Sequence, residues 1–171
     1  MTKFVKIAAL AATVLTATPA LAAPVASTTP PSATARIIRP LSLTSTGSLN
    51  FGTIVLNGVT ANRTVSLSAA GVLNCAGGSA ELACSGTTSV PTYNVRGTNN
   101  QVVTVIKAAS NLTNANDGTT LSMTPLGANS VTLTNSGSPG LDFNIGGSIT
   151  IGTATTDGVY SGTVDVQVDY Q

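Results

Sequence analysis

The sequence predicts an all-β protein with the architecture of an immunoglobulin-like β-sandwich. Apolar and polar residues alternate with a period of two in one short segment after another, and turn-forming Asn-Gly and Asp-Gly pairs separate many of these segments. No window after the N-terminal signal shows an apolar stripe at helical spacing. About eight or nine short strands with closely spaced turns fit two packed sheets better than a closed barrel.

The first 22 residues have the features of a secretory signal peptide. Lys3 and Lys6 precede an apolar run, and Pro19 and the small-residue pattern Ala20-Leu21-Ala22 follow it. The apolar run is shorter than the roughly 20 residues that span a bilayer, and the cleavage site has no cysteine that could carry a lipid. We therefore expect an exported protein that is cleaved after Ala22 and has no membrane anchor.

Residues 23–39, called the leader below, are expected to be flexible or extended. They are rich in Pro, Thr, Ser and Ala, and the adjacent Pro30 and Pro31 exclude a regular helix. An apolar alternation then begins, formed by Ala33, Ala35 and Ile37. Pro40 interrupts it, and we expect residues 40–171 to form a single β-sandwich domain.

The remaining strands are predicted from the same alternation. Leu41 and Leu43 mark the first of them. The others cover residues 49–56, 64–69, 91–96, 101–108, 120–126, 130–135, 141–151 and 158–171. Three turns supply the positive-φ residues that tight connections need, at Asn57-Gly58, Asn116-Asp117-Gly118 and Asp157-Gly158.

The two cysteines of the chain, Cys75 and Cys84, are predicted to form a disulfide. Both lie in the exported part of the chain and enclose the short segment CAGGSAELAC. A loop of this size contributes about 2 to 3 kcal/mol by the chain-entropy estimate, so we expect a local clip on one hairpin or loop. A redox pair would more usually show C-x-x-C spacing.

Composition argues against catalysis and against nucleic-acid binding. Cleavage of the signal removes Lys3 and Lys6 and leaves five of the seven basic residues against six acidic ones, with no basic run. The chain has no histidine, the commonest general base and metal ligand. Lys107 could serve a dyad, but its place in an alternating segment favours a solvated strand residue. We expect no enzyme, no catalytic residue, no metal and no cofactor.

The last strand alternates strictly, with one face expected to be buried and the other wet. The apolar face is formed by Val164, Val166, Val168 and Tyr170, and the polar face by Asp165, Gln167 and Asp169. An ordinary closing strand of a sandwich would show the same pattern, so periodicity alone leaves the partner of this strand open.

Both ends of the sequence resemble known exported β-proteins. Chaperone-usher pilus subunits end with alternating apolar residues, a penultimate Tyr and a Gly fourteen residues from the end, and here Tyr170 is penultimate and Gly158 is fourteenth from the end. Residues 40–54 resemble the opening of an uncharacterised alphaproteobacterial family related in pattern to spore coat U and archaic or alternative pilins. Its L-x-F-G motif is matched by Leu49, Phe51 and Gly52.

The resemblance implies a structural subunit of a cell-surface fibre that serves adhesion or biofilm formation. Such a subunit is a sandwich that lacks its last strand, and a neighbour's N-terminal extension fills the groove beside its terminal strand. Residues 32–39 would then be the donor strand, with Ala33, Ala35 and Ile37 entering the groove. The implied partners are identical or related subunits, an outer-membrane usher and a periplasmic chaperone that grips the carboxylate of Gln171. The cysteine pair departs from the family pattern, because many pilins join their first strand to a neighbouring one.

Two other functions remain open from the sequence. A self-complete periplasmic or surface sandwich could bind a carbohydrate or protein through a loop at residues 108–117, although 3 Tyr, 3 Phe and no Trp make a poor stacking platform for sugars. A coat or matrix protein would share the donor-strand geometry and differ only in its partners.

Overall fold

The computed structural model describes residues 22–171. The signal peptide predicted at residues 1–22 lies outside the described residues except for Ala22. The described chain falls into a compact unit, Arg36–Gln171, and the part of a second unit that precedes it in sequence. Residues 22–40 form no helix or strand and are exposed. Across residues 22–171, no helix has the length and apolar character needed to cross a bilayer.

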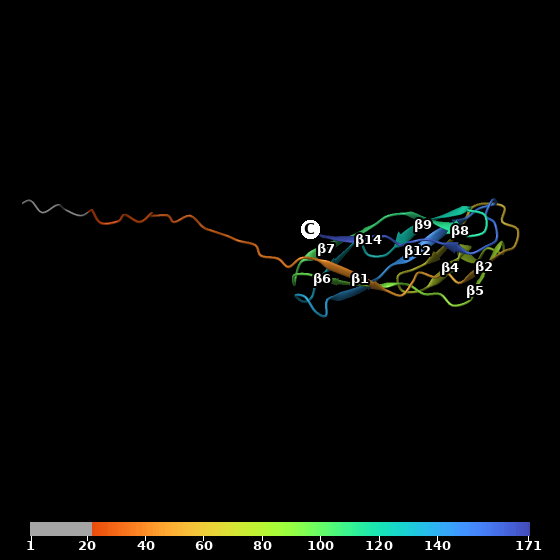
Figure 1. The fold of residues 1–171 in the computed structure, drawn as a ribbon, viewed down its shortest axis with the longest axis horizontal. Helices are drawn as coiled ribbons and strands as arrows, with labels where there is room; N and C mark the ends of the chain where they lie inside the picture. The colour runs from red at the N-terminus through yellow and green to blue at the C-terminus, as the bar shows by residue number, and fades with distance from the viewer. Residues whose placement is uncertain (1–21) are drawn as a thin grey trace, which may run out of the picture. The chain divides into compact units, whose positions relative to one another are not determined.

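Within the described residues the compact unit consists of short strands and one 3₁₀ turn (Figure 1). The first seven strands are β1 (Ser42–Thr46), β2 (Thr53–Leu56), β3 (Arg63–Leu67), β4 (Leu73–Cys75), β5 (Leu82–Ser85), β6 (Thr92–Arg96) and β7 (Val102–Lys107), with the turn η1 (Ala76–Gly78) after β4. The next seven are β8 (Ser110–Asn114), β9 (Thr120–Leu126), β10 (Ser130–Thr132), β11 (Leu141–Asn144), β12 (Gly146–Ile151), β13 (Tyr160–Ser161) and β14 (Val166–Tyr170).

The strands pair antiparallel in four sheets. A six-stranded sheet has the order β13-β8-β9-β12-β3-β4, two three-stranded sheets have the orders β1-β6-β11 and β10-β7-β14, and β2 and β5 form a ribbon. Apolar side chains of β1, β6 and β11 pack against those of β7, β10 and β14, and the ribbon packs on the six-stranded sheet. The prediction of an all-β sandwich is therefore confirmed.

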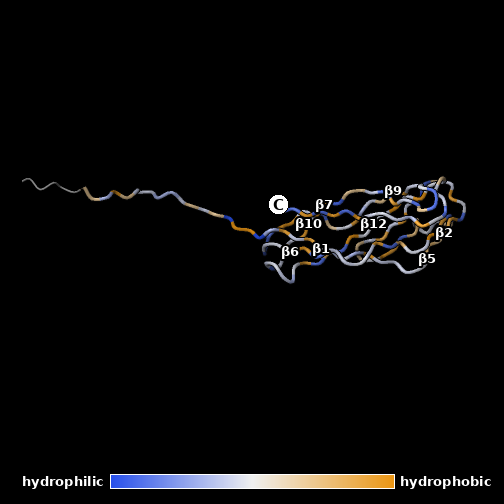
Figure 2. Tube along the Cα trace, in the orientation of Figure 1, coloured by the Kyte–Doolittle hydropathy of each residue, from blue (hydrophilic) through white to orange (hydrophobic). Residues whose placement is uncertain are grey.

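Period-two burial explains why these segments are strands. In β9, which has the predicted bounds 120–126, Leu121, Met123 and Pro125 are buried, whereas Thr120 and Ser122 are exposed. Each large apolar side chain buried in this way stabilises the fold by roughly 1.5 to 3 kcal/mol. Figure 2 shows the resulting mixture of hydrophobic and hydrophilic residues along the strands.

The strand predicted at residues 141–151 is two strands in different sheets. β11 pairs with β6 and β12 pairs with β3 and β9, with the fully buried Ile145 between them. Gly146 permits this change of sheet, because a Cβ there would collide with the backbone at Leu67 and Ser68. Alternation continues across the break, so the sequence pattern does not reveal it.

Strands β4, β5 and β8 are not predicted from the sequence. β8 falls within residues 108–117, for which the sequence predicts a loop, and this prediction is wrong for Ser110–Asn114. Leu112 is the one large apolar residue in β8, too few to produce a recognisable alternation. Pairing with β9 and β13 determines the conformation of this segment instead.

Candidate strand-binding groove

The terminal strand predicted at residues 158–171 is interrupted. β13 pairs with β8 through Tyr160 opposite Asn114, and β14 pairs with β7 from Val166 opposite Lys107 to Tyr170 opposite Val103. The pairing register shifts by one residue between the two ladders, as at a β-bulge. Gly162 lies in the interruption, where a Cβ would come within 2.7 Å of the Asn111 carbonyl oxygen.

The two faces of the terminal strand are as predicted. Val164, Val166, Val168 and Tyr170 are partly buried, and Asp165, Gln167 and Asp169 are exposed. Val164, Val166 and Val168 pack on the cluster of Tyr93, Val105 and Ile145. Tyr170 packs on a second cluster, which consists of Val95, Val103 and Leu133.

One edge of β14 is free in the part of the chain that the structure describes. There β14 pairs with β7 alone, on one side. The N–H of Gln171 donates to the Val102 carbonyl at 3.1 Å, and hydrogen-bonded pairs alternate along an antiparallel ladder. Val166, Val168 and Tyr170 therefore turn their backbone N–H and C=O groups away from β7, which leaves a free sheet edge.

A groove lies beside residues 155–164, which lead into β14, and opens onto the core. Its larger compartment, about 690 Å³, is bounded by residues 51–56 and 155–160 and floored by Leu112, Leu121 and Ile149. A second compartment of about 330 Å³ includes Leu112, Met123 and Val164 in its lining. Both compartments share Leu112, and the floor residues Leu121, Met123 and Ile149 belong to the buried core. The hydrophobic residues of β2, orange in Figure 2, form one wall of the larger compartment.

Asn114 fixes residues 156 and 157, which line the groove on the side opposite β2 and are called its rim. It is only 1% exposed, yet all its polar atoms are used. Its Nδ2 donates to Thr156 Oγ1 at 3.2 Å and to the Asp157 carbonyl at 3.0 Å, and its Oδ1 accepts from the Asn116 N–H at 3.0 Å. Gly158 lies against this amide with φ of 145°, and a Cβ there would collide with the Asn114 side chain. The rim therefore requires glycine at position 158. The burial of Asn114 is not predicted by the sequence pattern.

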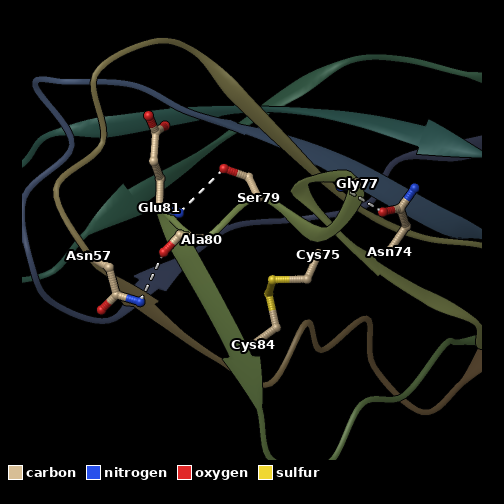
Figure 3. Close-up of a disulfide and its surroundings, with 8 residues drawn as sticks. All are labelled: Asn57, Asn74, Cys75, Gly77, Ser79, Ala80, Glu81 and Cys84. Carbon is tan, nitrogen blue, oxygen red and sulfur yellow. Dashed lines mark hydrogen bonds between the residues drawn. A yellow bond between two sulfur atoms is a disulfide. The ribbon is translucent and has the colours of Figure 1, made fainter.

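A disulfide ties the β2–β5 wall to the six-stranded sheet. It joins Cys75 at the end of β4 to Cys84 in β5, with a Cα–Cα distance of 5.9 Å (Figure 3). Cys84 lies opposite Ile54 of β2. The predicted bond is present. Of the two expected positions, one hairpin or one loop, it closes the loop between β4 and β5, because these two strands belong to different sheets.

Glu81 adds a polar attachment to the same wall. Its carboxylate accepts from Arg63 Nε at 2.6 Å and from Thr60 Oγ1 at 2.6 Å. The hydrogen bond from Arg63, followed by the one from Thr60, lowers the pKa of Glu81 to about 2. This ion pair connects the start of β3 with the residue that precedes β5.

Residues 41–170 match the model of a family described as a domain of unknown function, DUF4402. The chain belongs to this family. Comparisons with curated proteins and with solved structures gave no match. The DUF4402 domain spans β1 to β14 and therefore includes both walls of the groove, whereas the leader precedes the matched residues.

Tyr170, in the last strand of the DUF4402 domain, holds the end of the leader. The Tyr170 hydroxyl accepts from the Thr98 N–H at 2.8 Å and donates to the Arg39 carbonyl at 2.7 Å. Arg39 also donates its N–H to Thr98 Oγ1 at 2.7 Å, and the Arg36 guanidinium donates to Gln101 Oε1. The leader therefore joins the domain beside the C-terminal end of β14.

The predicted donor side chains are exposed in this structure. Ala33 and Ala35 are exposed, and Ile37 is 89% exposed. None of the three lies in a strand. The structure thus brings the predicted residues of the terminal strand together and leaves the leader side chains outside any sheet.

Lys107 lies in a strand, as predicted, but its ammonium is held by the protein. Its Nζ donates to the carbonyls of Gly127 at 2.9 Å and Ala128 at 2.6 Å, and to Asn129 Oδ1 at 2.8 Å. Partial burial lowers the pKa of Lys107. The ammonium has three donors and all are used, so the residue clamps the β9–β10 turn of the DUF4402 domain onto β7.

Proposed function

We propose that this protein is a structural subunit of a cell-surface fibre, in which the leader of one copy completes the sandwich of the next. The observation that carries this proposal is the free edge of β14 in the described part of the chain, together with a groove that opens onto the core beside residues 155–164, just before β14. A free edge with unpaired backbone groups pairs readily with another extended chain, and exposed apolar surface favours a partner that covers it.

The leader has the properties that such a partner needs. Its residues 32–39 contain no proline and are exposed without forming a strand, and apolar and polar residues alternate from Ser32 to Ile37. An extended segment that adds to a sheet edge gains main-chain hydrogen bonds, while alternate side chains enter pockets. Identical or related subunits are therefore the proposed partners, and the fibre would serve adhesion or biofilm formation.

Transport of such a subunit requires protection of the groove before assembly. We propose that a periplasmic chaperone supplies a temporary strand and that an outer-membrane usher passes the subunit to the growing fibre. The support for this step is the sequence resemblance at Gly158 and Tyr170 together with the apolar floor of the groove.

Deletion of the leader tests the proposal. The exported chain is expressed with and without residues 23–39, and periplasmic and surface fractions are run on denaturing gels with and without boiling. A ladder of multimers that collapses only on boiling and disappears with the deletion is the expected result. Compact monomers from both chains would overturn the proposal and favour a self-contained binding module.

A further inference from the structure

Two carboxylates stand free beside the open edge of β14. Within the residues that the structure describes, the one salt bridge joins Arg63 and Glu81, so Asp165 and Asp169 have no charged partner there. Neither of these aspartates makes a side-chain hydrogen bond in the same part of the chain. Both lie on the exposed face of the terminal strand. The leader has a complementary cation, Arg36, whose guanidinium donates to Gln101 of its own chain in this structure and would exchange that contact on insertion. Arg36 alternates with Ala35 and Ile37 and so would face solvent when they face a groove.

The space beside the terminal strand is not uniform. Near the end of β14, Val168 and Tyr170 share a packed cluster with Leu41 and Leu43. Near Val164 the sandwich is hollow, because the compartment of about 330 Å³ opens there. A strand added along this edge can therefore place small side chains beside Val168 and a large one beside Val164.

The inward-facing side chains of the leader increase in size along the sequence, whereas the space beside the terminal strand decreases from Val164 to Val168. In order, these leader side chains are Ala33, Ala35 and Ile37. Antiparallel pairing places Ile37 opposite Val164 and Ala33 opposite Val168, whereas parallel pairing would press Ile37 into the closed part of the edge. The same antiparallel register places Arg36 opposite Asp165.

Prolines set the limits of the same ladder. In this register Pro31 falls opposite Tyr170, the last residue of β14, and Pro40 falls opposite Ser161, the last residue of β13. Proline lacks an N–H and cannot complete a ladder hydrogen bond. The proline-free residues 32–39 thus lie opposite residues 162–169, which run from the residue after β13 to the residue before the end of β14.

Resting on the proposed strand exchange, we propose that Arg36 of one copy pairs with Asp165 of the next and sets the register of insertion. Directly opposed residues on one face have Cβ atoms within reach of an ion pair. Asp169 would lie opposite Ser32 and gain no charged partner.

Cysteine pairs in the full exported chain test the register directly. Arg36→Cys combined with Asp165→Cys is expected to give a covalent ladder that survives boiling and disappears on reduction. Arg36→Cys combined with Asp169→Cys is the matched control, because it offers the same chemistry on the same face, and it is expected to give no covalent ladder. A ladder from the control and none from the first pair would overturn the register.

Charge reversal tests the ion pair. Arg36→Glu and Asp165→Arg are each expected to weaken multimer formation roughly fivefold at low salt, and the double variant to restore it. Asp169→Arg should leave multimer formation unchanged. A wild-type chain that forms no multimers would reject the fibre function itself, whereas wild-type multimers that tolerate both single reversals would reject only the role of Arg36 and Asp165.

Discussion

The hydroxyl of Tyr170 donates a hydrogen bond to the carbonyl oxygen of Arg39 at 2.7 Å, across 131 positions of the sequence. This contact places the junction between leader and domain next to the end of the terminal strand. The same hydroxyl accepts from the Thr98 N–H, so one side chain fixes two backbone segments. Gly97 makes room for it, because a Cβ at this position would collide with the hydroxyl.

Tyr170→Phe should destabilise the domain by about 1 to 3 kcal/mol, because the part-buried Thr98 N–H loses its acceptor. Urea unfolding of the full chain measures the change. Thr150→Val, at an exposed position on β12, is a suitable control and should have little effect. Equal stability of Tyr170→Phe and wild type would show that the hydroxyl does not hold the junction.

Gly158→Ala should destabilise the domain more than Gly71→Ala. Both glycines have positive φ, but a Cβ at Gly158 would collide with Asn114, whereas a Cβ at Gly71 would meet nothing within 4 Å. Backbone strain costs on the order of 1 to 3 kcal/mol at either site, and the collision adds to it only at Gly158. Thermal unfolding of the two variants gives the difference, and equal losses would contradict the rim contact.

Acidification should weaken the domain partly through Glu81. Its folded pKa of about 2 lies below the ordinary value of 4.5, so its ionised form is favoured by folding. The stability it contributes is present above about pH 4.5 and is lost as the pH falls towards about 2. Urea midpoints should therefore fall less steeply over this range for Glu81→Gln than for wild type. Parallel pH profiles would argue against the Arg63–Glu81 contact.

Loss of the disulfide should affect both stability and the groove. Replacement of Cys75 and Cys84 by serine should cost about 2 to 3 kcal/mol from loop closure. It should also free the β2–β5 wall, which would be seen as faster proteolysis between residues 51 and 85 than elsewhere in the domain. Uniform proteolysis would mean that packing alone holds the wall.

The sequence predicted those features that depend on local periodicity. The two faces of the terminal strand and the bounds of β9 follow from alternation within a single segment. The glycines of all three predicted turns, Gly58, Gly118 and Gly158, have positive φ as expected. Such features require no knowledge of which strands pair.

Features that depend on pairing between distant segments were not predictable in this way. The break at Ile145 and the strand status of β8 are decided by their neighbours in the sheets. The floor of the groove combines Leu112, Leu121 and Ile149, which become adjacent only after β8, β9 and β12 assemble. Asn114 is a buried polar residue whose Nδ2 donates to partners more than forty positions away, at Thr156 and Asp157.

Amide hydrogen exchange at β14 tests the central claim most directly. The N–H groups of Val166, Val168 and Tyr170 are measured in the monomeric full chain and in assembled multimers, with Val103 and Val105 of β7 as internal references. We expect fast exchange at the three β14 positions in the monomer and strong protection after assembly. Protection of all three amides already in the monomer would show that the edge of β14 is satisfied within its own chain and would contradict the account.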